Sequence, residues 1–166
     1  MIAKSPIVKH LVLIGGGHSH LAVLKHLGMH PVPGLAVTLI SRDINVPYSG
    51  LLPGFISGTY DTKEISIDLR PLAQFAKARI IQADIKNIDL NDKKLILPNR
   101  PNISFDLLSI NIGSEPNLNM IPGAQDHAIG IKPLPAFLEL WPQLLQRTIS
   151  TLTLKEQFKF AIVGGG

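Results

Sequence analysis

The sequence predicts an α/β protein built on a doubly wound parallel sheet, with a small antiparallel β-meander inserted into it. The first observation is residues 8–28, where an apolar run stops at three glycines and a helical pattern follows. The second is residues 35–40, a short β-branched apolar run typical of a buried parallel strand. The third is a change to strand periodicity after residue 78, with short runs at 78–82, 84–90 and 94–97 and a turn at Asn91-Asp92.

The glycine turn predicts nucleotide binding. Gly15 and Gly17 fit the first two glycines of a G-x-G-x-x-G pattern, with Gly16 between them. Residues without a β-carbon allow a tight turn and a close approach of a pyrophosphate, whose charge the helix N-terminus holds. His20 stands in place of the third glycine, so we expect a wider approach of helix and strand. The pattern favours an imidazole packed toward the sheet, and an imidazole that points at the ligand is the alternative. A glycine-rich turn without a ligand is the alternative reading. Gly28 is expected to end the helix.

Further candidate contacts follow the turn and the second strand. His18 and Ser19 open the helix and are candidates for phosphate contact. Ser41 comes where a ribose-binding acid is usual, so ribose recognition would rest partly on Asp43. Arg42 would face adenine or a phosphate, or be a solvated surface charge. The His-x-His pair has no third ligand near it in sequence, and we predict no metal site.

The remaining elements are predicted from the positions of Pro, Gly and capping residues and from the periodicity of apolar residues. Residues 46–54 are too rich in Pro and Gly for a helix or a central strand, and form either a packed surface loop or a pocket wall. Residues 65–77 predict a helix capped by Asp68, and residues 105–112 predict a buried strand. A helix over 132–147 contains Pro142, which predicts a kink or break.

The last residues repeat the pattern found at the start of the chain. An apolar run over 158–163 leads into three glycines, as at the start of the chain. We expect a second nucleotide-binding unit to begin there, so that the chain is a fragment of a longer protein.

Composition narrows the function classes. The net charge of +4 comes from scattered Lys and Arg, which does not favour nucleic acid as a partner. The absence of cysteine excludes disulfides, thiolate metal sites and dithiol redox chemistry in this segment. No apolar run reaches the roughly 18 residues of a spanning helix, and no secretory signal is seen, so a cytoplasmic protein is expected.

Five landmarks in order resemble the two-dinucleotide-binding-domain flavoproteins, the pyridine nucleotide-disulfide oxidoreductase fold that includes type II NADH dehydrogenases and sulfide:quinone reductases. They are the glycine turn, the segment 83–89, N-I-G-S-E-P at 111–116 in place of A-T-G-S-x-P, I-P-G-A at 121–124, and I-V-G-G-G at 162–166. His20, Ser41 and Asn111-Ile112 depart from the family pattern.

The resemblance implies an FAD-binding domain over 1–156 and the first strand and truncated glycine loop of an NAD(P)H-binding domain over 157–166. FAD would be the cofactor and NAD(P)H the co-substrate, with hydride passing to the flavin in the intact protein; the fragment itself would be inactive. Tyr48 and Ser49 would meet the flavin edge or stabilise a turn, and no residue is a convincing general acid or base. The alternative is a non-catalytic module in which FAD or NAD is structural or sensory. The implied cofactor contacts are Gly15, Gly16, Gly17, His18, Ser19, Ser41, Arg42, Ser49, Gly50, Ile85 and Gly113.

A narrower resemblance joins G-G-G-H-S-H at 15–20 with P-Y-S-G-L-L-P-G at 47–54. Together they are most similar to the flavoprotein half of proteins fused to a selenophosphate synthetase. This implies a role in selenium metabolism and a fused synthetase domain downstream. A homodimer is a further expectation. The electron acceptor stays open between a quinone, oxygen and a selenium or sulfur species.

Overall fold

The computed structural model describes residues 6–153, 157 and 159–164. The chain divides into two compact units, Met1–Gly113 and Ser114–Gly166, each described here by itself.

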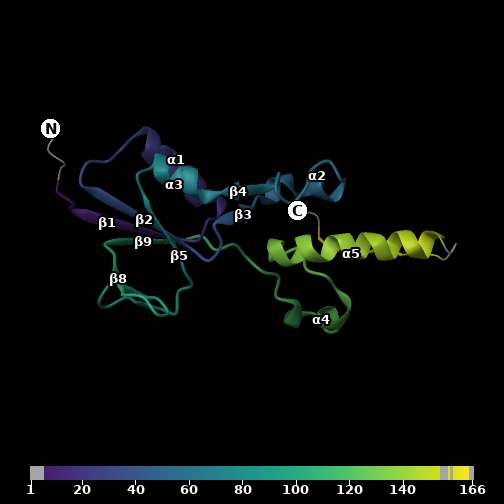
Figure 1. Cartoon of the computed structure of the whole chain (residues 1–166). Helices are drawn as coiled ribbons and strands as arrows, with labels where there is room; N and C mark the ends of the chain where they lie inside the picture. Colours follow the sequence, from purple (N-terminus) through teal and green to yellow (C-terminus); the bar gives the residue numbers. More distant parts are fainter. Residues whose placement is uncertain (1–5, 154–156, 158, 165–166) are drawn as a thin grey trace. The chain divides into compact units, whose positions relative to one another are not determined.

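The first unit is organised around a four-stranded parallel sheet in the order β5-β2-β1-β9 (Figure 1). The register places Leu13 of β1 opposite Leu39 of β2, and Leu11 opposite Leu107 of β9. The parallel α/β sheet predicted from the sequence is confirmed. Its strands are β1 (Lys9–Ile14), β2 (Leu35–Ser41), β5 (Arg79–Gln82) and β9 (Leu107–Ile110).

Two helices cover one face of this sheet: α1 (His18–Met29) and α3 (Leu69–Phe75). Successive strand residues point to opposite faces, so alternate positions of β1 and β2 meet the helices. Leu13 and Leu39 join Leu24 of α1 and Leu69 of α3 in one hydrophobic cluster.

The other face is covered by an antiparallel three-stranded sheet (Figure 1). Val12, Ile14 and Ile40 point to this side and pack with Leu95 and Phe105. The meander therefore takes the place that a second helical layer has in other doubly wound sheets. It consists of β6 (Asn87–Asp89), β7 (Lys94–Ile96) and β8 (Ile103–Ser104).

The segment after β2 is more regular than its Pro and Gly content predicts. Strand β3 (Asn45–Pro47) pairs antiparallel with β4 (Ser66–Asp68), and between them lie a 3-10 turn, η1 (Ser49–Leu51), and a short helix, α2 (Leu52–Ile56). The prediction that this segment forms no helix is wrong, because Pro53 falls in the first turn of α2, where the missing N–H costs nothing. As predicted, the segment forms no central strand, since β3 pairs with β4 alone.

Helix boundaries differ at two places. The predicted helix 65–77 begins only at Leu69, after β4, although its cap is confirmed: Asp68 accepts a hydrogen bond of 2.9 Å from the amide of Arg70. Helix α1 ends at Met29, one residue past the predicted end at Gly28. A β-carbon there would lie 2.9 Å from Cγ of Phe75, so this glycine permits the close approach of α3.

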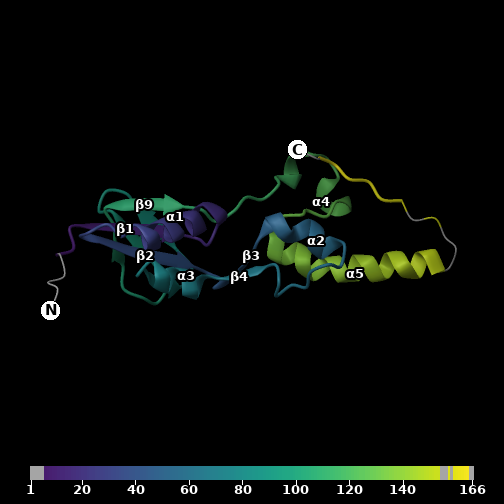
Figure 2. The same ribbon diagram turned by 90° about the horizontal axis from the view of Figure 1, so that it is seen from above.

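The second unit contains η2 (Leu118–Met120), α4 (Ala124–His127) and the long helix α5 (Leu134–Thr153). Helix α5 continues through Pro142, so the predicted break is absent (Figure 2). The predicted strand 158–163 is not formed by its described residues, 159–163, while Phe158 lies outside the described residues. A strand needs a neighbour for its backbone N–H and C=O groups, and no strand of the described chain pairs with this stretch.

Candidate functional site

The glycine turn, Gly15 to Gly17, is fixed at the carboxyl edge of the parallel sheet by the strands on both sides of β1. The amide of Gly15 donates to the carbonyl of Ile40 at the end of β2 (2.7 Å). On the other side, Gly17 donates to the carbonyl of Asn111 (3.1 Å), whose own amide donates to Ile14 (2.8 Å). In open parallel sheets this edge is where ligands bind.

Glycine is required at this turn by the protein itself. Gly15 has φ +88°, and a β-carbon there would overlap the Asn111 carbonyl. A β-carbon on Gly17 would lie 2.7 Å from the same carbonyl oxygen and would overlap the Asn111 side chain. Sequence reasoning assigned these glycines to a ligand and missed Asn111. The sequence did contain an indication of this role, because Asn111 is larger than the alanine that the resembled family has at this position.

The start of α1 offers unpaired backbone donors. The amides of His20 and Leu21 donate back to the carbonyl of Gly17 (2.9 and 3.3 Å). Within the described chain, the amides of Gly16, His18 and Ser19 donate to no protein acceptor. The first turn of α1 has no acidic side chain, so its positive end is not neutralised from within. Three unpaired N–H groups at a helix N-terminus form a donor set that fits a pyrophosphate.

His20 is buried on the sheet side of α1, with 1% of the residue exposed, as its place in the pattern predicts. Its Nδ1 lies 2.7 Å from the carbonyl oxygen of Gly15, and its Nε2 lies 2.9 Å from Oγ of Ser109 on β9. A carbonyl only accepts, so Nδ1 carries a proton and donates. In the neutral ring, Nε2 then accepts from the Ser109 hydroxyl.

His18 is exposed beside the turn and stacks on Tyr48, with ring centroids 5.0 Å apart and planes 16° apart. Tyr48 is held by its amide, which donates to Ile65 (2.7 Å). A β-carbon on Gly50 would lie 2.7 Å from Cζ of the Tyr48 ring. The structure thus brings the segment 48–50 to the turn through one aromatic pair, with Ser49 exposed next to it.

Ser41, Arg42 and Asp43 follow β2. The Ser41 hydroxyl is buried and donates to the carbonyl of Asp43 (2.7 Å), so its proton stabilises the turn and is not free for a ribose. Arg42 is exposed and lies 3.7 Å from the Asp43 carboxylate.

A cavity of about 370 Å³ lies beside this turn, at the carboxyl ends of β2 and β5. Sequence reasoning missed Arg70 and Gln82 there, because they come from α3 and β5 and only folding brings them to residue 43. The Arg70 side chain also pairs with the Asp68 carboxylate (2.8 Å). This contact and, next to it, the hydrogen bond from the Arg70 backbone amide hold the pKa of the Asp68 carboxyl below its usual value. The cavity is lined by Asp43, Ile44, Asn45, Arg70 and Gln82.

The sequence profile of the family described as pyridine nucleotide-disulphide oxidoreductase matches residues 9–166. The chain belongs to this family. Among its relatives, the NADH dehydrogenase-like protein YutJ of Bacillus subtilis is 28% identical over 96% of this chain and 42% of its own length. The external alternative NAD(P)H-ubiquinone oxidoreductase B4 of Arabidopsis thaliana is 25% identical over 95% of this chain and 30% of its own. The chain thus spans less than half the length of these curated relatives.

Two solved structures show the same fold. The sulfide:quinone oxidoreductase of Aquifex aeolicus superposes with a TM-score of 0.70 at 24% identity, covering 86% of this chain and 33% of the other. A ferredoxin reductase from Rhodopseudomonas palustris gives 0.61 at 20% identity, covering 86% and 35%. At these identities the likeness shows the fold alone.

Two of the predicted cofactor contacts lie elsewhere in the first unit: Ile85 is apart from the glycine turn, and Gly113 is at the boundary of the unit. Ile85 is half-buried and packs against the hydrophobic cluster on the meander face. Gly113 is the last residue of the first unit and has φ +86°.

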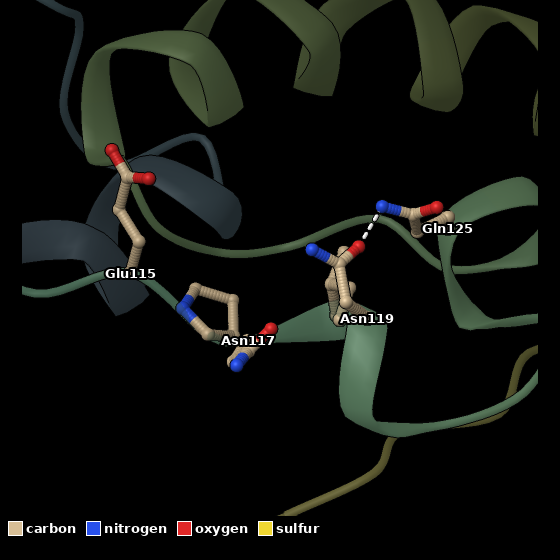
Figure 3. Close-up of a pocket in the computed structure, with 6 residues that line it drawn as sticks. Glu115, Asn117, Asn119 and Gln125 are labelled. Atoms are coloured by element: carbon tan, nitrogen blue, oxygen red, sulfur yellow. Dashed lines mark hydrogen bonds between the residues drawn. The ribbon is translucent and has the colours of Figure 1, made fainter.

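A second cavity, of about 560 Å³, lies within the second unit (Figure 3). Its polar groups are one carboxylate, Glu115, and side-chain amides, and Gln125 donates to Asn119 across it. Its one charged side chain is a carboxylate, which repels a phosphate, so the glycine turn is the better site for a dinucleotide. Its lining consists of Glu115, Pro116, Asn117, Leu118, Asn119 and Gln125.

The described residues contain no cluster of three or more His, Cys, Asp or Glu side chains placed to hold a metal ion. Among the helices of the same residues, none combines the length and apolarity needed to cross a bilayer.

Proposed function

We propose that the intact protein is an FAD-dependent NAD(P)H oxidoreductase and that this chain carries its FAD pyrophosphate site. The observation that carries the proposal is the set of three unpaired amides at the start of α1, on the edge of the sheet where ligands bind. Membership of a pyridine nucleotide oxidoreductase family supports it, as do relatives described as NADH dehydrogenase-like and as an NAD(P)H-ubiquinone oxidoreductase.

Different residues of the site bind different parts of the cofactor. The amides of Gly16, His18 and Ser19 bind pyrophosphate oxygens, while the glycines of the turn keep its backbone close. The His18 ring and the Ser19 hydroxyl add side-chain donors at the same place.

Other contacts extend along the dinucleotide. Ser41 holds the turn after β2 through its hydroxyl, and the exposed Arg42 and Asp43 of that turn face the ribose and adenine, with the backbone at Ile85 against the adenine. Ser49, Gly50 and Gly113 lie on the flavin side.

FAD supplies the chemistry when bound, because its ring accepts a hydride from NAD(P)H. This chain's residues hold and orient the cofactor, and none is assigned as a general acid or base. The proposed domain boundary comes from the resemblance to the flavoprotein family: residues 1–156 belong to the FAD domain, and residues 157–166 begin the NAD(P)H domain.

The two motifs at 15–20 and 47–54 support a finer proposal. It places the protein among cytoplasmic flavoproteins fused to a selenophosphate synthetase, with a selenium species as a candidate electron acceptor.

The test uses the purified full-length protein that contains this chain. We expect it to be yellow from bound FAD and to bleach when NADH or NADPH is added without oxygen. Tightly bound FAD that neither nucleotide bleaches would show the non-catalytic alternative. A protein that stays colourless after incubation with excess FAD would overturn the proposal.

A further inference from the structure

We propose that His20 is a positioning residue of the dinucleotide site and acts through the peptide bond between Gly15 and Gly16. The inference rests on the proposed function, because it concerns how the pyrophosphate-binding amides are oriented. His20 is separated from the ligand by that peptide, so its role is distinct from that of a binding residue.

The contact between His20 and the turn is specific. The ring donates from Nδ1 to the carbonyl of Gly15 at 2.7 Å, and both groups are buried. No other donor reaches that carbonyl within the described part of the chain. Without the imidazole, the Gly15 carbonyl would be a buried acceptor with no partner, which is a costly state.

This hydrogen bond determines where the Gly16 amide points. The peptide between Gly15 and Gly16 is trans, so its C=O and N–H point in opposite directions. Holding the carbonyl toward His20 directs the Gly16 N–H away from the ring, and this N–H is one of the three unpaired donors at the turn.

A peptide between two glycines needs such a restraint. Glycine adopts positive and negative φ with similar ease, so the Gly15–Gly16 peptide rotates at little cost unless something holds it. The ring is itself anchored to β9, because Nε2 lies 2.9 Å from the hydroxyl of Ser109. The arrangement therefore links the turn to the strand beside it through one side chain.

Two substitutions of similar polarity separate positioning from packing. In His20→Asn the side-chain amide nitrogen stands at the same bond distance from Cβ as Nδ1, so it still donates to Gly15. In His20→Gln the amide lies one bond further out, where Nε2 was, and meets Ser109 instead. Gln fills more of the buried space than Asn, so a packing role predicts higher stability and tighter FAD binding for Gln.

Positioning predicts the opposite order of affinities. We expect His20→Gln to weaken FAD binding by the loss of one hydrogen bond to a charged group, about tenfold or more. His20→Asn should stay closer to the wild type in FAD affinity although its ligand-free protein melts at the lower temperature. Ser109→Ala is the comparison variant, because it removes the anchor at Nε2 and leaves the bond to Gly15; its loss of FAD affinity should be smaller than that of His20→Gln.

A measurement on the unaltered full-length protein needs no variant. Nitrogen NMR of His20 should show a protonated Nδ1 and an unprotonated Nε2. The opposite tautomer, or an FAD affinity of the Gln variant equal to or better than that of the Asn variant, would overturn the positioning role. A wild-type protein that binds no FAD would instead overturn the proposed function, so the two failures are distinguishable.

Discussion

The carbonyl oxygen of Asn111 lies 2.7 Å from the point where a β-carbon on residue 17 would stand. The same oxygen accepts a hydrogen bond from the amide of Gly17 (3.1 Å). The end of β9 and the start of α1 are therefore in contact through backbone atoms. Any side chain at residue 17 must push them apart before it meets a ligand.

Gly17→Val should for this reason remove FAD from the full-length protein. The branched side chain would displace the turn from Asn111 and break the hydrogen bond that fixes it, at a cost of about 1–3 kcal/mol for overpacking. The measurement is flavin per polypeptide in the purified variant, together with its circular dichroism. A folded variant with unchanged flavin content would contradict the assignment of the turn.

A paired variant tests the cause. Gly17→Ala also overlaps Asn111, and Asn111→Ala removes the side-chain part of that overlap while leaving the carbonyl. We expect the double variant to bind FAD better than Gly17→Ala alone. Equal binding would show that the backbone contact alone determines the effect.

The parallel sheet, the glycine turn and the meander were predictable, because each depends on the local periodicity of apolar residues and on turn-forming residues near in sequence. The burial of His20 also followed from its place in the pattern. Its partners did not, because Gly15 and Ser109 meet the ring only when β9 pairs with β1. The cavity that joins Asp43 to Arg70 and Gln82 is hidden in the sequence for the same reason.

Helix boundaries failed where tertiary contacts override local signals. Gly28 was predicted to end the first helix, which ends one residue later at Met29, and the missing β-carbon of Gly28 makes room for Phe75. Residues 66–68 read as the start of a helix, yet they pair with β3.

The meander should depend on Leu95 for its attachment to the sheet. Leu95 is fully buried in the cluster with Val12 and Ile40, so Leu95→Ala should lower the free energy of unfolding by about 2–5 kcal/mol. Leu90→Ala is the matched control in the same meander, because that side chain is 74% exposed; its effect should lie within about 0.5 kcal/mol. Urea unfolding of both variants checks this, and equal losses would show that the meander does not pack as described.

Asp106 should make stability depend on acid pH. The amide of His10 (2.7 Å) and, next in weight, the ammonium of Lys9 (3.1 Å) lower the pKa of its carboxyl in the folded chain. A lowered folded pKa means that this stabilisation is complete above the unfolded pKa of about 3.9 and is lost as the pH falls through the folded value.

Asp106→Asn should therefore lower the urea midpoint at pH 6, with the difference from the wild type shrinking below about pH 4. Asp84→Asn is the control, because Asp84 is exposed and makes no hydrogen bond or ion pair with any described residue. A difference that stays constant from pH 6 to pH 3 would exclude an ionised Asp106 as its source.

The stack of His18 on Tyr48 should tune FAD affinity. The two rings lie 5.0 Å apart and nearly parallel, which holds the imidazole beside the unpaired amides of α1. Tyr48→Leu removes the stack, so His18 regains rotational freedom that FAD binding must then restrict. An aromatic pair is worth about 0.5–1.5 kcal/mol, so the dissociation constant for FAD should rise about two- to twelvefold.

Two variants separate the ring contact from the phenol. Tyr48→Phe keeps the stack and loses only the hydroxyl, so its affinity for FAD should stay at the wild-type level. In a His18→Ala background, Tyr48→Leu should add little, because the ring that it positions is already gone. Isothermal titration of the flavin-free proteins with FAD gives the affinities of the wild type and of the four variants. A Phe variant as weak as the Leu variant would instead indicate that the Tyr48 hydroxyl itself meets the flavin.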